Sequence, residues 1–144
     1  MSTNYRNPPM NTEQLAVIVN CANQSLRGET TFPEVVQSLQ AIGLERYHID
    51  YSCHVGTYYL PSGAATTLTL AHPDATVAET FNAVGVESAV RAIQRGEIYY
   101  QEFLQRTMEA GCIGYTVFIS GARVLYFGRN GDVHEERFGG PSAN

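Results

Sequence analysis

The sequence predicts an α+β protein: an internally duplicated α-α-β-β-β module with pseudo-two-fold symmetry, its helices packed on a mostly antiparallel sheet. The first observation is a self-match. Shifting the chain by 68 positions aligns residues 27–63 with 95–131 and gives ten identities in 37 positions, where chance would give roughly two or three. The second is that the hydrophobic period changes from 3.6 to 2 inside each copy, which indicates helices followed by strands. Because neither copy can bury its own helices, the two are expected to share one core.

The length of 144 residues suits one domain with a sizeable core. We predict a single domain over residues 11–138, made of repeats 11–70 and 76–138 with a short connector between them. Residues 1–10 are polar and contain prolines, which favours a disordered leader, and residues 139–144 are expected to fray as a tail.

Two helices are predicted at the start of the first repeat. Asn11 followed by Gln14 is typical of a helix N-cap, and apolar residues then recur at helical spacing until Gly28 ends the helix. Thr31 with Glu34 has the pattern of a capping box, so a second helix is expected to begin there and run to the next glycine.

Three strands are predicted to follow. Tyr47, Ile49 and Tyr51 alternate with polar residues, which is typical of a half-buried strand over residues 47–52. Turn-forming residues then separate strands expected at 57–60 and 66–70.

The second repeat is predicted to follow the same plan. Thr76 with Glu79 has the pattern of another capping box, and an apolar stripe from Ala83 continues the helix to residue 96. A second helix is expected over residues 100–111, followed by strands that begin near Tyr115 and Arg123. The pair at residues 130–131, Asn-Gly, indicates a hairpin turn before a polar edge strand at 133–138.

Composition narrows the classes of partner. The formal charge is −5, with nine Lys and Arg against fourteen Asp and Glu, so nucleic acid and anionic membranes are disfavoured. No apolar run approaches the ~20 residues that span a bilayer, and the first residues show no secretory signal. Three cysteines without a close pair do not make a disulfide framework. These features favour a cytoplasmic protein with reduced thiols.

The sequence contains no strong catalytic or cofactor motif. The glycines at 128 and 131 lack the lysine and the strand-loop-helix context of a phosphate-binding loop. There is no serine in a nucleophile elbow and no His-Glu-x-x-His pattern. We therefore predict no cofactor and no catalytic residue, and the sequence favours a non-enzymatic protein.

Several short motifs carry a family resemblance. They are residues 100–104 (Tyr-Gln-Glu-Phe-Leu), 110–112 (Ala-Gly-Cys), 114–115 (Gly-Tyr) and 124–128 (Val-Leu-Tyr-Phe-Gly), with a helix and a tyrosine hairpin in the first half. Over roughly residues 12–138 the chain resembles an uncharacterised bacterial family, also called YbcV-like, whose members carry the label "phage envelope protein". The resemblance implies a small α+β protein without an established activity.

His48, Asp50 and His54 form the most suggestive cluster of chemical groups. Two imidazoles and a carboxylate are a donor set that can hold Zn²⁺ or serve in acid/base chemistry. The equivalent positions of the second repeat carry Thr, Phe and Ala, so a solvated polar sheet face is the competing interpretation. Cys53 is a candidate thiol because it adjoins His54, although neighbouring side chains on a strand or turn usually point apart.

Nine tyrosines and no tryptophan make the aromatic composition unusual. The simplest interpretation is that the tyrosines pack under the helices with their hydroxyls at the rim. The alternative is a pocket on the pseudo-axis that binds a flat ligand. The candidate ligand-binding residues are Tyr58, Tyr59, Thr116, Phe118 and Tyr126.

We therefore expect a small-molecule-binding or protein-interaction module, with the ligand or partner on a sheet face or in the groove between the copies. A sheet face carrying Tyr59, Thr116 and Phe118 could also form a homodimer. The alternative function is a metal-dependent or acid/base enzyme using His48 and its neighbours. A phage-related structural role is a third hypothesis.

Overall fold

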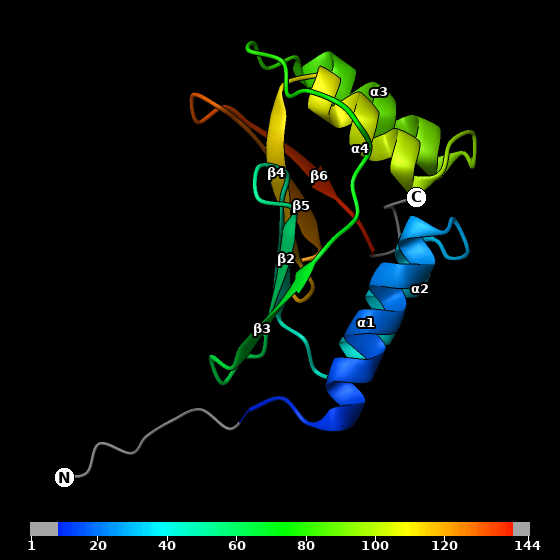
Figure 1. The fold of residues 1–144 in the computed structure, drawn as a ribbon, viewed down its shortest axis with the longest axis vertical. Helices are drawn as coiled ribbons and strands as arrows, with labels where there is room; N and C mark the ends of the chain where they lie inside the picture. The colour runs from blue at the N-terminus through cyan, green and yellow to red at the C-terminus, as the bar shows by residue number, and fades with distance from the viewer. Residues whose placement is uncertain (1–8, 140–144) are drawn as a thin grey trace, which may run out of the picture.

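The computed structural model describes residues 9–139, which form an α+β fold with the element order α-α-β-β-β-α-α-β-β-β (Figure 1). The helices are α1 (Thr12–Leu26), α2 (Phe32–Ala41), α3 (Ala83–Gln94) and α4 (Tyr100–Glu109). The strands are β1 (Arg46–Asp50), β2 (Val55–Tyr59), β3 (Ala65–Thr69), β4 (Cys112–Phe118), β5 (Arg123–Gly128) and β6 (Val133–Arg137). The leader predicted for residues 1–10 and the tail predicted for 139–144 fall almost wholly outside the described residues.

The six strands form one sheet in the order β3-β2-β1-β4-β5-β6, and every pair is antiparallel. β1 and β4 are central, so the strands of the two halves of the chain meet in the middle of the sheet. In this pairing His48 lies opposite Thr116, Tyr47 opposite Val117, and Ile49 opposite Tyr115. The predicted antiparallel sheet is confirmed.

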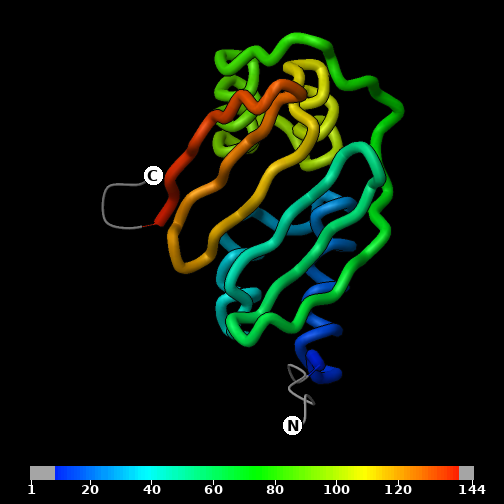
Figure 2. Tube along the Cα trace, turned by 90° about the vertical axis from the view of Figure 1, so that its left-hand side faces the viewer, coloured from blue at the N-terminus to red at the C-terminus, as the bar shows by residue number. Residues whose placement is uncertain are grey.

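Both helix pairs cover the same face of the sheet. Figure 1 shows the α1–α2 pair and the α3–α4 pair on one side of the strands, and Figure 2 shows the strands from the opposite side, with no described helix in front of them. The alternation of burial follows this arrangement: Tyr47, Ile49 and Tyr58 are buried, whereas His48 and Thr57 are only half-buried. The tyrosine and isoleucine positions of β1 therefore face the helices.

The helix starts in the first half were predicted correctly. The Asn11 side chain accepts a hydrogen bond from the Gln14 amide, and the Gln14 side chain accepts one from the Asn11 amide. Thr31 and Glu34 make the same reciprocal pair. Such caps satisfy amide groups that have no partner inside the helix.

The capping box predicted at Thr76 and Glu79 is wrong, because α3 begins seven residues later at Ala83 with Asn82 as its cap. The segment before α3 instead bonds to the end of α4: the Ala78 amide donates to the Met108 carbonyl, and the Asn82 amide to that of Ala110. These backbone bonds replace those of a first helical turn.

Gly111 permits this close approach of the segment to α4. Its φ is +89°, and a Cβ there would lie 2.4 Å from the Thr80 carbonyl oxygen. Only glycine fits both the left-handed backbone and the contact. The first half differs here, because Gly43 has a similar φ of +79° but nothing within 4 Å of an added Cβ.

The core lies between the helices and the inner sheet face. Its most deeply buried side chains come from both halves of the chain and include Ile18, Leu39, Val86, Met108 and Val117. Burying such side chains contributes about 1.5–3 kcal/mol each. In the part of the chain described here, no helix combines the length and the apolar character needed to cross a membrane.

Candidate functional site

A large groove opens between the two helix pairs above the inner face of the sheet. Its volume is about 1270 Å³, and its lining is more apolar than polar. Ala22 of α1 and Val90 of α3 contribute to opposite walls, and Tyr47 and Tyr115 of the two central strands contribute to the floor. Small-molecule sites are commonly apolar clefts of this kind with a few convergent polar groups.

Aromatic rings form most of the floor. Tyr47 and Tyr58 are stacked with ring centroids 5.3 Å apart, and Tyr115 and Tyr126 are tilted at 5.5 Å. Phe103 of α4 packs edge-on against Tyr115 at 6.4 Å. All five rings line the groove, so a bound molecule would meet several aromatic faces and edges.

Several tyrosine hydroxyls lie in the groove, and some of them are hydrogen-bonded. The Tyr51 hydroxyl lies 2.8 Å from Thr107 Oγ1. Tyr47, Tyr58 and Tyr126 also line the groove, and each carries a phenolic hydroxyl. Each is both a donor and an acceptor, which suits a polar atom on a bound molecule.

The groove tyrosines are neutral near pH 7. Burial raises the pKa of Tyr47, Tyr115 and Tyr126 above the ordinary phenol value, because a phenolate would lose its hydration there. The pKa of Tyr100 is raised by burial to about 12. The floor therefore offers neutral hydroxyls and π faces, without phenolate charge.

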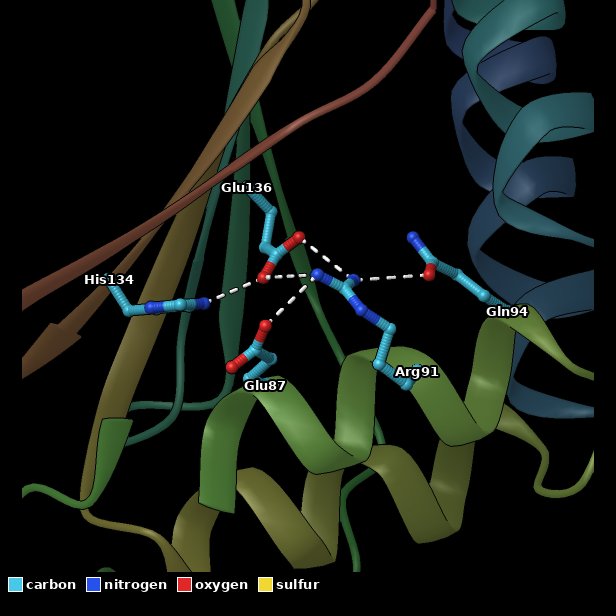
Figure 3. Close-up of polar contacts among 5 residues, drawn as sticks. All are labelled: Glu87, Arg91, Gln94, His134 and Glu136. Carbon is cyan, nitrogen blue, oxygen red and sulfur yellow. Dashed lines mark hydrogen bonds and ion pairs between the residues drawn. The ribbon is translucent and has the colours of Figure 1, made fainter. Parts of the chain in front are cut away.

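One end of the groove carries a polar network that joins α3 to β6 (Figure 3). Arg91 Nη1 lies 3.0 Å from Glu136 Oε1, and Arg91 Nη2 lies 3.2 Å from Glu87 Oε2. His134 Nε2 lies 2.7 Å from the other oxygen of Glu136. Hydrogen bonding to Glu136 is the main reason that the pKa of Arg91 is raised, so the guanidinium stays charged.

The other end carries two stacked imidazoles. The rings of His54 and His72 lie 3.3 Å apart at 6° and both residues line the groove. His54 has a φ of +59° at the turn after β1, and within residues 9–139 its Nδ1 is the buried side-chain polar atom without a partner. A buried imidazole nitrogen in that state is available to a ligand or a water molecule.

The predicted ligand-binding residues divide between the two sheet faces. Tyr58 and Tyr126 lie in the groove. Tyr59, Thr116 and Phe118 belong to the uncovered face, because side chains alternate along β2 and β4. On that face the Arg46 guanidinium lies 4.1 Å from the centre of the Tyr59 ring. A single small ligand would not contact all five residues.

The predicted metal-ligating residues also take separate roles. His48 Nδ1 lies 2.7 Å from Thr116 Oγ1 on the uncovered face. Asp50 Oδ1 accepts hydrogen bonds from the amides of Ser52 and Cys53, which form the turn after β1, and His54 stacks on a second imidazole. Residues 9–139 contain no group of three or more His, Cys, Asp or Glu side chains placed to hold a metal ion.

Cys53 is exposed, and its surroundings do not activate it. Desolvation, and then the nearby Asp50 carboxylate, raise its pKa, so the thiol is favoured over the nucleophilic thiolate.

Arg91, Glu136 and His134 were not predicted as site residues. The His134 side chain is half-buried and contacts Glu136. The available signal was the polar alternation of β6, which places His134 and Glu136 on the same face. The contact with Arg91 depends on how α3 lies over the edge strand.

Comparison with known proteins assigns the chain to a protein family. A model described as "Protein of unknown function (DUF1398)" matches residues 20–136, which extend from α1 to β6. No curated protein matches the chain. The expectation of a family without an established function is therefore confirmed, whereas the phage envelope label and the YbcV-like relationship stay predictions.

Proposed function

Since this chain belongs to the DUF1398 family of proteins of unknown function, we propose from its own geometry that it binds a flat small molecule in the groove between its helix pairs. The observation that carries the proposal is a cavity of about 1270 Å³ with a floor of aromatic rings. Binding of this kind requires no catalytic residue, in line with the absence of a catalytic motif in the sequence.

The same proposal includes an internal duplication, with the groove on the axis between the copies. Positions 68 apart occur together in its lining, including Tyr47 with Tyr115 and Tyr58 with Tyr126. A cavity built from equivalent residues of two copies would present similar aromatic surfaces to both sides of a ligand. A flat molecule suits such a site because it has two similar faces.

The backbone supports a two-fold relation between the halves. The Tyr51 amide donates to the Ile113 carbonyl and the Ile119 amide to that of Glu45, each at 2.9 Å. Residues 51 and 119, like 45 and 113, are 68 positions apart, so exchanging the halves converts one bond into the other. Such reciprocal contacts are the signature of an isologous two-fold interface.

Unusual backbone angles recur with the same spacing. His54 and Ala122 are the two non-glycine residues with positive φ in the described chain, at +59° and +53°. Gly28 and Gly96 have φ of +69° and +72°. Left-handed backbone is rare outside glycine, so its recurrence at equivalent turns supports a common origin of the two halves.

A second candidate function is association through the uncovered sheet face. This face presents Tyr59 and Phe118 beside polar residues, and no described helix covers it (Figure 2). A homodimer through this face would show as concentration-dependent mass in sedimentation experiments, and Phe118→Arg should reduce it. The metal or acid/base hypothesis for His48, Asp50 and His54 and the phage-related structural role have no comparable supporting observation.

The test of ligand binding is native mass spectrometry of the purified protein, compared with the same sample after denaturation. We expect additional mass of a small molecule that is lost on denaturation. Ala22→Trp should fill the groove and abolish this mass, whereas Ala41→Trp places the same ring on an exposed position of α2 and should retain it. Equal retention by both variants would contradict binding in the groove.

A further inference from the structure

The charge of the groove indicates which ligands it can accept, an inference that rests on the proposed small-molecule function. Charged side chains in the lining comprise four carboxylates and two guanidinium groups: Glu29, Glu34, Asp50 and Glu136 against Arg91 and Arg137. With neutral histidines the lining carries two net negative charges. Charge of this sign repels an anion and attracts a cation.

The polar end concentrates the negative charge inside the groove. The Glu136 side chain is 12% exposed, whereas that of Arg91 is 41% exposed. Arg91 also forms an ion pair with Glu87 at 3.2 Å and donates a hydrogen bond to Gln94 Oε1 at 3.2 Å (Figure 3). The Glu136 carboxylate is buried, whereas the Arg91 guanidinium is more exposed and is bonded to three side chains. Water therefore screens the positive charge more than the negative one.

The influence of Glu136 and Arg91 on the pKa of Tyr126 also indicates that negative charge prevails at this end of the groove. Burial is the main reason that the pKa of Tyr126 is raised; among the charged groups, Glu136 raises it more than Arg91 lowers it. Glu136 therefore opposes ionisation of Tyr126 even though it is paired with Arg91.

The aromatic floor adds a second attraction for positive charge. The π faces of Tyr47, Tyr58 and Tyr115 carry partial negative charge, and cations bind over such faces with about 0.5–2 kcal/mol per contact. The neutral hydroxyls of the same residues can accept hydrogen bonds from a cationic N–H group. We propose that the groove selects planar organic cations, with Glu136 as the residue that determines this preference and Tyr126 beside the positive group.

The test compares three planar probes of the same ring size: N-methylacridinium as the cation, acridine as the neutral molecule and acridine-9-carboxylate as the anion. Binding is measured by probe fluorescence at mildly alkaline pH, where acridine is uncharged. We expect the cation to bind about tenfold more tightly than acridine, equivalent to about 1.4 kcal/mol, and the anion to bind weakest.

Glu136→Gln should reduce the affinity for N-methylacridinium far more than the affinity for acridine, and so remove most of the cation preference. Glu102→Gln is the matched control, because Glu102 pairs with Arg106 on the exposed surface of α4 and neither residue lines the groove. Equal affinities for all three probes, or tighter binding of the anion, would overturn the cation preference and leave ligand binding intact. If none of the probes binds, the groove is not a site for planar molecules, and the proposed function fails as well. The ranking of the probes on the unaltered protein needs no variant, so a folding defect in Glu136→Gln does not prevent the test.

Discussion

His48 and Thr116 face each other across the two central strands, with His48 Nδ1 2.7 Å from Thr116 Oγ1. The two residues are 68 positions apart, so under the proposed duplication they occupy the same position in the two copies. A two-fold axis through the sheet would then pass between them. A residue and its own equivalent pair directly only at such an axis, which makes this contact a marker of how the halves join.

The first prediction concerns this contact. Thr116→Val should reduce the free energy of unfolding by about 1 kcal/mol, the usual net value of one hydrogen bond. In a double-mutant cycle with His48→Ala, urea unfolding should give a coupling energy of about 0.5–1 kcal/mol. Thr57→Val is the control, because Thr57 flanks His48 on the other side without a hydrogen bond to it. If the coupling energy between His48 and Thr57 were as large as that between His48 and Thr116, packing and not the hydrogen bond would link His48 to Thr116.

The second prediction concerns the core beneath α2. Leu39 is 1% exposed, and Leu39→Ala should lower the free energy of unfolding by about 2–5 kcal/mol because it leaves a cavity between the helix and the sheet. Leu15 in α1 is 37% exposed, so Leu15→Ala should cost about 0.5 kcal/mol or less. Chemical denaturation of both variants provides the measurement, and similar losses would contradict the assigned helix faces.

Much of the fold could be predicted because local signals agree with it. The capping box at Thr31 and the alternation around Ile49 depend only on neighbouring residues, and both are confirmed. The capping pattern at Thr76 failed because a competing partner, the end of α4, is far away in the sequence. A pattern of local residues contains no information about that competition.

The site was predicted less completely, for a related reason. Tyr58 and Tyr126 could be proposed from the aromatic composition and the repeat, and both lie in the groove. Alternation alone does not identify the covered face, so Tyr59 and Phe118 were grouped with them although they belong to the other face. Glu136 becomes a groove residue only through the placement of α3 over the sheet edge.

The third prediction compares two glycines with left-handed backbone. Gly96→Ala should cost about 1 kcal/mol, because φ is +72° but no atom lies within 4 Å of the added Cβ. Gly111→Ala should cost clearly more, since the Cβ would lie 2.4 Å from the Thr80 carbonyl oxygen and displace the segment before α3. Thermal unfolding distinguishes the two. Equal losses of stability in the two variants would show that the segment before α3 moves away from the added Cβ without an energetic cost.

The last prediction concerns alkaline pH. Tyr100 is half-buried with its hydroxyl 2.6 Å from that of Tyr115, and desolvation raises its pKa to about 12, against about 10 for an unfolded chain. The folded protein therefore holds the proton at pH values where the unfolded chain has lost it. The stabilisation is fully present below about pH 10 and decreases between about pH 10 and 12, by up to about 1.4 kcal/mol per pH unit for each such tyrosine.

Urea unfolding across this pH range should show a steep loss of stability, and the phenolate absorbance of the buried tyrosines should rise together with unfolding. Tyr100→Phe removes one titrating group, so the free energy of unfolding should fall less steeply with pH, by the contribution of about one tyrosine. The variant also removes the hydrogen bond to Tyr115. The two effects separate cleanly, because the lost hydrogen bond lowers stability equally at neutral pH, whereas the changed slope appears only above about pH 10. Phenolate absorbance as high as that of the unfolded chain, in a protein that is still folded at about pH 11, would contradict the burial of the groove tyrosines.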